Sequence, residues 1–210
     1  MEEGGTVHKK HEREAPPHSV LGSLRALIPT HDRVAFAEAL RVAEQQANKL
    51  LHLHGHPKLP IPAELIMELP KVTVEYTRHI VSGATFWHHH RQTWIIHLSR
   101  SDSPRRQRFT LAHEYKHIID HGRHHLLYKG TRRTTAETQA ERAADYFAGC
   151  LLVPRQLLKR AWHNGVTQTH RLAELFHVSE QAIEVRLRQC GLVHNKRRGL
   201  GSLALEDFPS

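Results

Sequence analysis

Two histidines and a glutamate follow the pattern H-E-x-x-H at His113, Glu114 and His117. On a helix, residues four apart lie on one face, so both imidazoles can bind one Zn²⁺ at about 2.0–2.1 Å. Glu114 would then stand beside the ion without binding it, where its carboxylate can accept a proton from water. The pattern predicts His113 and His117 as metal ligands and Glu114 as the catalytic base.

Histidine accounts for 21 of the 210 residues. At that frequency the pattern arises by chance in roughly one such chain in six, so a third ligand is needed to support it. His121 is excluded, because it lies eight residues from His113, about 12 Å along the helix axis. A metzincin would have a histidine at position 123, which is Arg123 here. The third ligand is therefore expected from another helix.

A second helix is predicted to begin at Thr134, which forms a capping-box pattern with Glu137. Glu141 and Asp145 lie four apart on one face of this helix. Glu141 is the predicted third ligand and completes a His₂Glu set with one open coordination position. Asp145 is expected to accept the free ring N–H of a ligand histidine. The alternative is that the two acids and Arg142 form a solvated charged stripe.

Three blocks of sequence share their order and spacing with a known family: Arg106–Glu114, Glu141–Ala148 and Leu151–Pro154. On these blocks the chain resembles the ImmA/IrrE family of metallo-endopeptidases over roughly residues 30–193. The resemblance implies a small gluzincin-like zinc protease that cleaves a helix-turn-helix transcriptional repressor and so releases stress-response or mobile-element genes. The family commonly has Leu-Gly where this chain has Tyr115-Lys116. The metal site is expected to survive this difference, whereas the cleft shape and substrate preference stay open.

The helix that carries the two histidines has clear boundary signals. Ser103 is a favoured N-cap, Pro104 suits the first helical position, and Gly122 follows the last turn. Upstream, apolar residues at steps of three and four predict an amphipathic helix from Thr30 to about His54. The expected fold class is α+β, with a mostly helical zincin-like domain.

Three strands are predicted before the histidine helix, at 72–77, around 80–87 and at 93–98. They are expected to form a small antiparallel sheet, whose edge strand can bind an extended peptide and present its carbonyl to the metal. The turn at 88–91 contains three successive histidines, whose side chains would diverge. It therefore favours an exposed loop over a second metal site.

Two further helices are predicted around a turn at His177-Val178, with Ser179 as the N-cap of the second helix. This pattern is typical of a helix-turn-helix. If the unit reads DNA, four residues of its second helix would be the exposed candidates: Gln181, Glu184, Arg186 and Arg188. Acidic residues on that helix oppose phosphate, which favours a unit that supports the protease or docks its substrate. The alternative for the whole chain is a non-catalytic DNA-binding regulator with a structural or sensory metal.

Basic residues outnumber acidic ones by 30 to 21, and seven of the nine net positive charges lie in residues 101–210. This distribution suits an acidic partner or nucleic acid. Cys150 and Cys190 are the only cysteines, lack a CxxC arrangement, and are predicted to be reduced core thiols in a cytoplasmic protein. No apolar run approaches the roughly 20 residues of a membrane span, so no membrane partner is expected.

The chain is expected to divide into four parts. These are a disordered extension at 1–29, the zincin-like metallopeptidase domain at 30–163, the helix-turn-helix at 164–194, and a flexible tail at 195–210. The expected cofactor is Zn²⁺, with Mn²⁺ or Fe²⁺ as alternatives in the cell. The expected partner is a helix-turn-helix repressor as protein substrate, with DNA as a second partner through the C-terminal unit.

Overall fold

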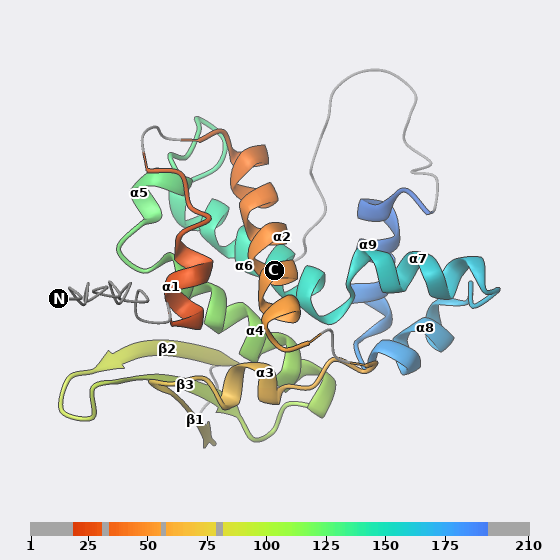
Figure 1. The fold of residues 1–210 in the computed structure, drawn as a ribbon, viewed down its shortest axis with the longest axis horizontal. Helices are drawn as coiled ribbons and strands as arrows, with labels where there is room; N and C mark the ends of the chain where they lie inside the picture. The colour runs from red at the N-terminus through yellow and green to blue at the C-terminus, as the bar shows by residue number, and fades with distance from the viewer. Residues whose placement is uncertain (1–18, 31–33, 56–57, 79–81, 193–210) are drawn as a thin grey trace, which may run out of the picture.

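The computed structural model describes residues 19–30, 34–55, 58–78 and 82–192. Its helices are α1 (Val20–Arg25), α2 (Phe36–Leu53), α3 (Glu64–Met67), α4 (Pro104–Asp120), α5 (His124–Leu127), α6 (Ala136–Leu152), α7 (Arg155–His163), α8 (Thr169–Phe176) and α9 (Glu180–Cys190). Its strands are β1 (Val72–Thr77), β2 (Gly83–His88) and β3 (Thr93–Ser99). Figure 1 shows the sheet below α1, α2, α4 and α6, with α7 to α9 gathered at one end. The α+β class is confirmed, whereas the predicted tail at 195–210 and the strand start near Ile80 lie outside the described residues.

The sheet is mixed, so the prediction of an antiparallel sheet is wrong for one of its two pairings. The strand order is β1-β3-β2, with β2 antiparallel to β3 and β1 parallel to it. The composition of the strands explains their order in the sheet. The run Trp94-Ile95-Ile96 is apolar on both faces and is buried, as befits a central strand. The other two strands are only half-buried, and each takes an edge.

Helix α4 packs on β2 and β3 and has the ends that its sequence predicts. The Ser103 hydroxyl accepts a hydrogen bond from the Arg106 amide, and Pro104 occupies the first turn. Gly122 lies just beyond the helix with a φ of +76°. The far end is closed by Arg25 of α1, whose guanidinium donates to the carbonyls of Ile118 and Ile119 at 2.7 and 3.0 Å. Arg25 thereby satisfies carbonyls that a helix end would otherwise leave unpaired.

Two predictions near the N-terminus are corrected. Residues 19–29 are not a disordered extension, because α1 is capped by Ser19 and buries Leu24 in the central core. The long helix begins at Phe36 rather than at Thr30, with Ala35 as its N-cap. The Val34 amide donates a hydrogen bond to the carbonyl of Leu126. This bond holds the chain extended at Val34, so the helix begins only after it.

Helix α6 packs between α2 and α4. It begins one residue later than predicted, since its N-cap is Thr135, which accepts from the Thr138 amide. Thr134 instead accepts a backbone bond from Thr131 in the preceding turn. Residues of α6 such as Phe147 and Leu151 belong to the central core, which joins α1, α2, α3, α4 and the sheet. Glu141 is therefore carried on a helix that is fixed on two sides.

The C-terminal helices form a hydrophobic cluster of their own. It contains Leu158 of α7, Phe176 of α8 and Ile183 of α9, and it starts at Leu152 at the end of α6. The turn between α8 and α9 has the predicted features: His177 is left-handed with φ 53°, and Ser179 caps α9. The predicted domain boundary at 163/164 stays a prediction, but α7 shares its core with α8 and α9. Across the part of the chain that the structure describes, no helix combines the length and apolar character of a bilayer span.

Candidate metal centre

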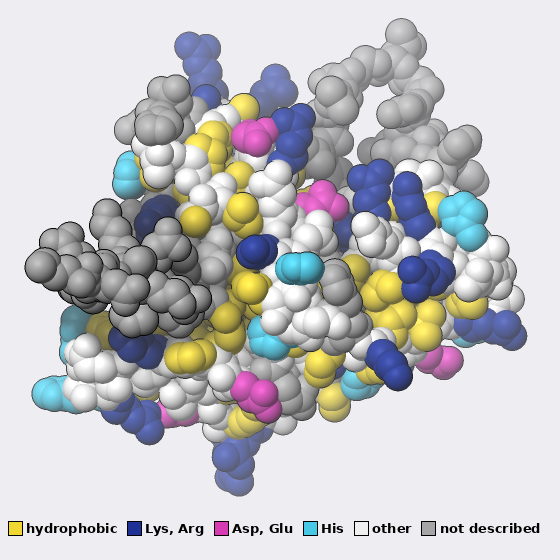
Figure 2. Space-filling model, in the orientation of Figure 1, with side chains coloured by type: hydrophobic (Ala, Val, Ile, Leu, Met, Phe, Trp, Pro, Cys, Tyr) yellow, Lys and Arg dark blue, Asp and Glu magenta, His cyan; other side chains and the backbone are white. Residues whose placement is uncertain are grey.

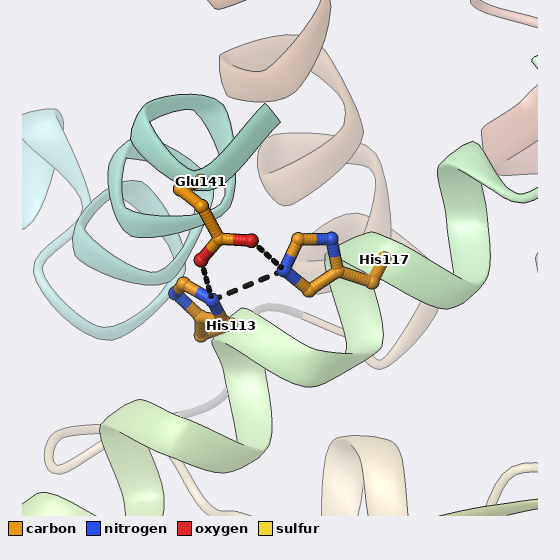
Figure 3. A group of neighbouring side chains, drawn as sticks. All are labelled: His113, His117 and Glu141. Carbon is orange, nitrogen blue, oxygen red and sulfur yellow. Dashed lines mark hydrogen bonds and ion pairs between the residues drawn. The ribbon is translucent and has the colours of Figure 1, made fainter. Parts of the chain in front are cut away.

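Helix α4 and helix α6 bring three potential ligands to one point. His113 and His117 project from successive turns of α4, and Glu141 reaches them from α6, as Figure 3 shows. The three ligand atoms all lie within 4.8 Å of one another. No other such group of His, Cys, Asp and Glu occurs among the described residues. The structure therefore brings together the three residues that the sequence pattern singled out.

The distances between these atoms fit an ion with tetrahedral coordination. With metal–ligand bonds of about 2.0–2.1 Å, neighbouring ligands of a tetrahedral Zn²⁺ lie about 3.3 Å apart. The His113 Nε2 and His117 Nε2 atoms are 3.1 Å apart. The two oxygens of Glu141 lie 3.1 Å from His113 Nε2 and 3.3 Å from His117 Nε2. The donor set, two imidazoles and one carboxylate, also suits zinc, and three ligands leave one position open.

Asp145 orients one of the imidazoles. Its Oδ1 lies 2.8 Å from His113 Nδ1, one turn of α6 beyond Glu141. A ring N–H at Nδ1 that donates to this carboxylate leaves the lone pair of Nε2 directed at the centre of the triad. Glu141 and Asp145 are thus not a charged stripe turned wholly to solvent, because both contact His113.

The charges of the cluster are strongly coupled. Burial disfavours charged His113, but hydrogen bonds with Asp145 and Glu141 outweigh burial and raise the pKa of His113 to about 9. Hydrogen bonds from His113 and His117 lower the pKa of Glu141. Burial raises the pKa of Glu114, while the two histidines pull it down. A raised carboxyl pKa brings Glu114 nearer to the range in which a base both takes up and releases protons.

A cleft of about 1150 Å³ opens beside the triad. Its walls come from α4, α6, the start of β2 and α9, and its lining includes His113, Glu114 and Glu141. A smaller hollow of about 320 Å³, lined by His117 and Glu141 among others, adjoins the other side. The three residues therefore lie between two hollows.

The other histidines that the sequence offered do not join the centre. His121 follows the end of α4 and packs against Trp94, with ring centroids 4.8 Å apart. His89 and His90 are exposed in the turn after β2, and the rings of His88 and His90 are 6.3 Å apart. Neither place gathers three ligand atoms in the described residues.

The family model of peptidase M78, an IrrE N-terminal-like domain, matches residues 70–188. The chain belongs to this family. No curated protein matches the chain. Among solved structures it is similar to a Mycobacterium tuberculosis transcriptional regulator, at 16% sequence identity and a TM-score of 0.54, over 86% of this chain and 54% of that one. That likeness shows a shared fold, and the present chain spans about half the length of that structure.

In this IrrE N-terminal-like domain, the departure at Tyr115-Lys116 does not touch the cleft. Both side chains are buried, at 1% and 0% exposure, and neither lines the cleft. The Lys116 ammonium lies 2.6 Å from Asp120 Oδ2, and the Tyr128 hydroxyl donates to the same oxygen at 2.5 Å. The side chains at these two positions therefore do not shape the lining of the cleft.

Sequence reasoning missed Gly83, which begins β2 and lines the cleft. A methyl group at this position would lie 2.3 Å from Thr110 Cγ2 and 2.7 Å from Glu114 Oε1. Glycine thus allows the edge strand to approach the glutamate of the family's H-E-x-x-H pattern. A glycine inside a predicted strand is a signal for close approach of this kind.

The four candidates on α9 divide into three exposed residues and one buried residue. Gln181, Glu184 and Arg188 are exposed as expected. Arg186 is only 2% exposed, so its prediction as an exposed DNA-reading residue is wrong. Its Nε donates to the Val153 carbonyl at 3.2 Å, which draws the side chain back onto α6.

Proposed function

We propose that this member of the IrrE N-terminal-like family is a zinc-dependent endopeptidase. The observation that carries the proposal is the convergence of His113, His117 and Glu141, with their ligand atoms within 4.8 Å, on a cleft that also contains Glu114. When bound there, a Zn²⁺ ion would lower the pKa of a water and polarise a peptide carbonyl.

Each residue has a distinct role in the proposed reaction. His113, His117 and Glu141 hold the ion, and Asp145 fixes the His113 ring through its Nδ1 atom. Glu114 accepts a proton from the attacking water and delivers it to the amine that leaves. Its position on the cleft beside the three candidate ligands supports this role.

Strand β2 supports the binding of an extended substrate. It is an edge strand, and its first residue, Gly83, lines the cleft next to Glu114. An extended peptide can pair with such an edge by backbone hydrogen bonds, which would carry a carbonyl past the catalytic glutamate.

We propose a helix-turn-helix transcriptional repressor as the protein substrate. Family membership supports a peptidase role and therefore a protein substrate. A reduced, cytoplasmic setting is also proposed, and the two buried free cysteines agree with it. DNA as a direct partner has no support of comparable weight.

The test of the proposal is Glu114→Gln, which keeps the size of the side chain and removes the base. Zinc-loaded wild-type and variant proteins are incubated with repressor proteins from the same genome, and products are identified by mass spectrometry. Cleavage is expected to fall by about 10²–10⁴-fold in the variant, the usual contribution of acid–base catalysis. Zinc content and helical circular dichroism are expected to match those of the wild type.

Glu174→Gln is the matched control, because Glu174 is exposed on α8 and does not line the cleft. This variant is expected to cleave at the wild-type rate. Full activity in Glu114→Gln with zinc still bound would remove Glu114 from the reaction and overturn the proposed mechanism.

A further inference from the structure

The smaller hollow opens on two of the three candidate ligands. Its volume is about 320 Å³, and its lining includes His117 and Glu141. The larger cleft reaches the same centre through His113 and Glu141. A peptide whose scissile carbonyl reaches the centre therefore has the cleft on one side and the smaller hollow on the other. A side chain next to the scissile bond can enter the smaller hollow.

The smaller hollow has the size and the lining to take one long side chain. A water molecule takes about 30 Å³ in the liquid, so the hollow equals about ten waters, too little for a further element of secondary structure. Ala136 and Ala140, four apart on one face of α6, line it together with the buried Tyr128. These residues offer methyl groups and an aromatic ring, against which an aliphatic stem can pack.

Contacts within the protein hold the α5 side of the hollow in place. The carbonyl of Leu126 in α5 accepts a hydrogen bond from the Val34 amide at 3.1 Å. The Tyr128 hydroxyl, just beyond α5, donates to Asp120 Oδ2 at 2.5 Å. The hollow is therefore a formed feature of the fold and needs no rearrangement of α5 to exist.

The charge on the lining of the hollow is acidic. No Lys or Arg of the described residues lines it, whereas Figure 2 shows several Lys and Arg side chains on the surface over α7 to α9. Two carboxylates line it, Glu137 and Glu141, and Glu141 belongs to the candidate metal centre. Burial lowers the pKa of His124, so this ring of the lining is uncharged at neutral pH.

Glu137 is the carboxylate that remains for a ligand. It lies in the first turn of α6 and borders both the cleft and the smaller hollow. A hydrogen bond with its own backbone and one with Thr135 lower the pKa of Glu137, so it is ionised at neutral pH. It forms no ion pair with a Lys or Arg of the described residues. The carboxylate is therefore available to a cation that enters the hollow.

We propose that the smaller hollow binds the side chain of a Lys or Arg that flanks the scissile bond of the protein substrate. The proposal rests on the proposed peptidase function, because it places the scissile bond at the candidate metal centre. The aliphatic stem packs against Ala136, Ala140 and Tyr128, and the charged end pairs with Glu137. Long basic side chains commonly bury the stem and keep the charged end near water in this way. An acidic residue at the same place would meet a charge of its own sign.

The test measures binding without requiring cleavage. Zinc-loaded wild-type protein is titrated by calorimetry at neutral pH with the hydroxamates of lysine, norleucine and glutamate. The hydroxamate group binds zinc, and norleucine has the aliphatic stem of lysine without the ammonium group. Lysine hydroxamate is expected to bind about threefold more tightly than norleucine hydroxamate, the usual effect of one exposed charge pair. Glutamate hydroxamate, with a shorter stem and the wrong charge, is expected to bind about tenfold more weakly than lysine hydroxamate.

Two variants separate the charge of the hollow from its space. Glu137→Gln removes the carboxylate and is expected to abolish the difference between lysine and norleucine hydroxamate. Ala136→Leu fills part of the hollow at a half-buried position and is expected to weaken both ligands by about tenfold, because less of the stem is buried. Acetohydroxamate, which has no long side chain, is expected to bind Ala136→Leu as tightly as the wild type.

Glu180→Gln is the matched control. Glu180 is also exposed in the first turn of its helix, but it lines the cleft and not the smaller hollow. This variant is expected to leave every affinity within about twofold of the wild type. Circular dichroism and zinc content verify that each variant is folded and loaded.

Three results would overturn the proposal. The first is equal binding of lysine and norleucine hydroxamate to the wild type, and the second is an unchanged difference in Glu137→Gln. The third is full binding of lysine hydroxamate to Ala136→Leu. Because Glu137 also borders the cleft, that result would place the basic side chain in the cleft and not in the smaller hollow.

The two proposals fail in different ways. If the hydroxamates bind as expected but zinc-loaded wild-type protein cleaves no repressor, the peptidase proposal fails and the basic-residue hollow stands. If wild-type protein cleaves a repressor at a bond that no Lys or Arg flanks, the hollow fails and the peptidase stands. Folded protein that binds no zinc would contradict both.

Discussion

Helix α4 carries two charged clusters with the same spacing and opposite character. On one side, His113 and His117 lie four residues apart and face Glu141. On the neighbouring face, Lys116 and Asp120 also lie four apart and form a buried ion pair. Both clusters place ionisable groups on successive turns of one helix. What separates them is access to solvent and the completeness of their internal pairing.

The Lys116 cluster is closed. The lysine is fully buried, its charge is matched by Asp120, and Tyr128 donates to the same carboxylate. Burial lowers the pKa of Lys116, and Asp120 counteracts this effect. Burial also raises the pKa of Tyr128, so its hydroxyl stays protonated as a donor. Every group in this cluster has a partner inside the protein.

The His113 cluster is open. The side chain of Glu141 is 60% exposed, and the cleft reaches both Glu141 and His113. Three lone-pair donors point at one another, an arrangement that is satisfied only by a proton or by a cation. The comparison teaches that spacing on a helix does not make a site; convergence of like donors on an accessible point does.

The largest effect is expected from Asp120→Ala, which leaves a buried lysine without its partner. Loss of one member of a buried ion pair costs about 3–5 kcal/mol of unfolding free energy. Chemical denaturation of the metal-free protein measures this loss. The double variant Lys116→Met with Asp120→Leu serves as the control, and is expected to stay close to wild-type stability. A loss below about 1 kcal/mol in Asp120→Ala would show that the cluster is not closed as described.

Gly83→Ala tests the His113 cluster, which is open to the cleft. The added methyl group would overlap Thr110 and press on the Glu114 carboxylate. A displacement of about 1 Å at a catalytic group lowers turnover by about a hundredfold, so kcat is expected to fall by that order while zinc stays bound. Steady-state kinetics with zinc analysis measures both. An Ala84→Gly variant, one residue along β2, is the control; unchanged kcat in Gly83→Ala would disprove the close approach as a requirement.

Asp145→Asn tests the orientation of the His113 ring. Loss of a carboxylate that holds a ligand imidazole typically weakens metal affinity by about 10–100-fold. Competition with a fluorescent chelator measures the zinc dissociation constant. The control is Asp102→Asn, for which little change in the zinc dissociation constant is expected. The Asp102 carboxylate accepts a hydrogen bond from Ser82 and precedes the start of α4, away from the candidate ligands. Equal affinity in wild type and Asp145→Asn would mean that the Nδ1 contact has no influence on the ion.

For each pH unit, the smallest effect is a pH dependence of opposite sign with and without metal. In metal-free protein the pKa of His113 is raised from 6.5 to about 9, so its contribution to stability is complete below pH 6.5 and is lost as the pH rises through about 9. The lowered pKa of Glu141 makes its contribution complete above pH 4.5 and lost on acidification. Zinc must displace the His113 proton, so zinc affinity is expected to rise about tenfold per pH unit towards pH 9.

Melting curves and chelator competition across this range measure the two trends. A zinc affinity independent of pH between 6.5 and 9 would contradict the prediction that His113 is protonated in the metal-free protein. His88→Gln, at the end of β2 and outside both hollows, is the control and is expected to leave both trends unchanged.

The sequence was sufficient for the features that depend on local spacing. The positions of His113, Glu114 and His117 follow from the helical repeat, and the boundaries of α4 follow from Ser103, Pro104 and Gly122. The left-handed residue His177 and the cap Ser179 were likewise predictable, because turn conformations depend on a few adjacent residues. Glu141 required one further assumption, that two separate helices meet.

The features that the sequence did not reveal depend on which elements become neighbours. Two candidate partners were available to β1, and only packing decided that it pairs with β3 in parallel. Arg186 was expected to be exposed because a helical repeat does not show where α6 will lie. The closed pair Lys116 and Asp120 was visible as a spacing, but its burial depended on Tyr128 and the fold around it.

The guanidinium of Arg25 has a consequence for the minimal working unit of this protein. It belongs to a helix that precedes the family-matched region at residues 70–188, yet it bonds to the last carbonyls of the helix bearing both histidines. A chain trimmed to residues 70–188 would retain every ligand while losing Arg25 and also α2, which packs against α6. Helices α1 and α2 thus stabilise the two helices that carry the candidate ligands. Destabilising α1 or α2 is expected to weaken metal binding, although neither helix contributes a ligand.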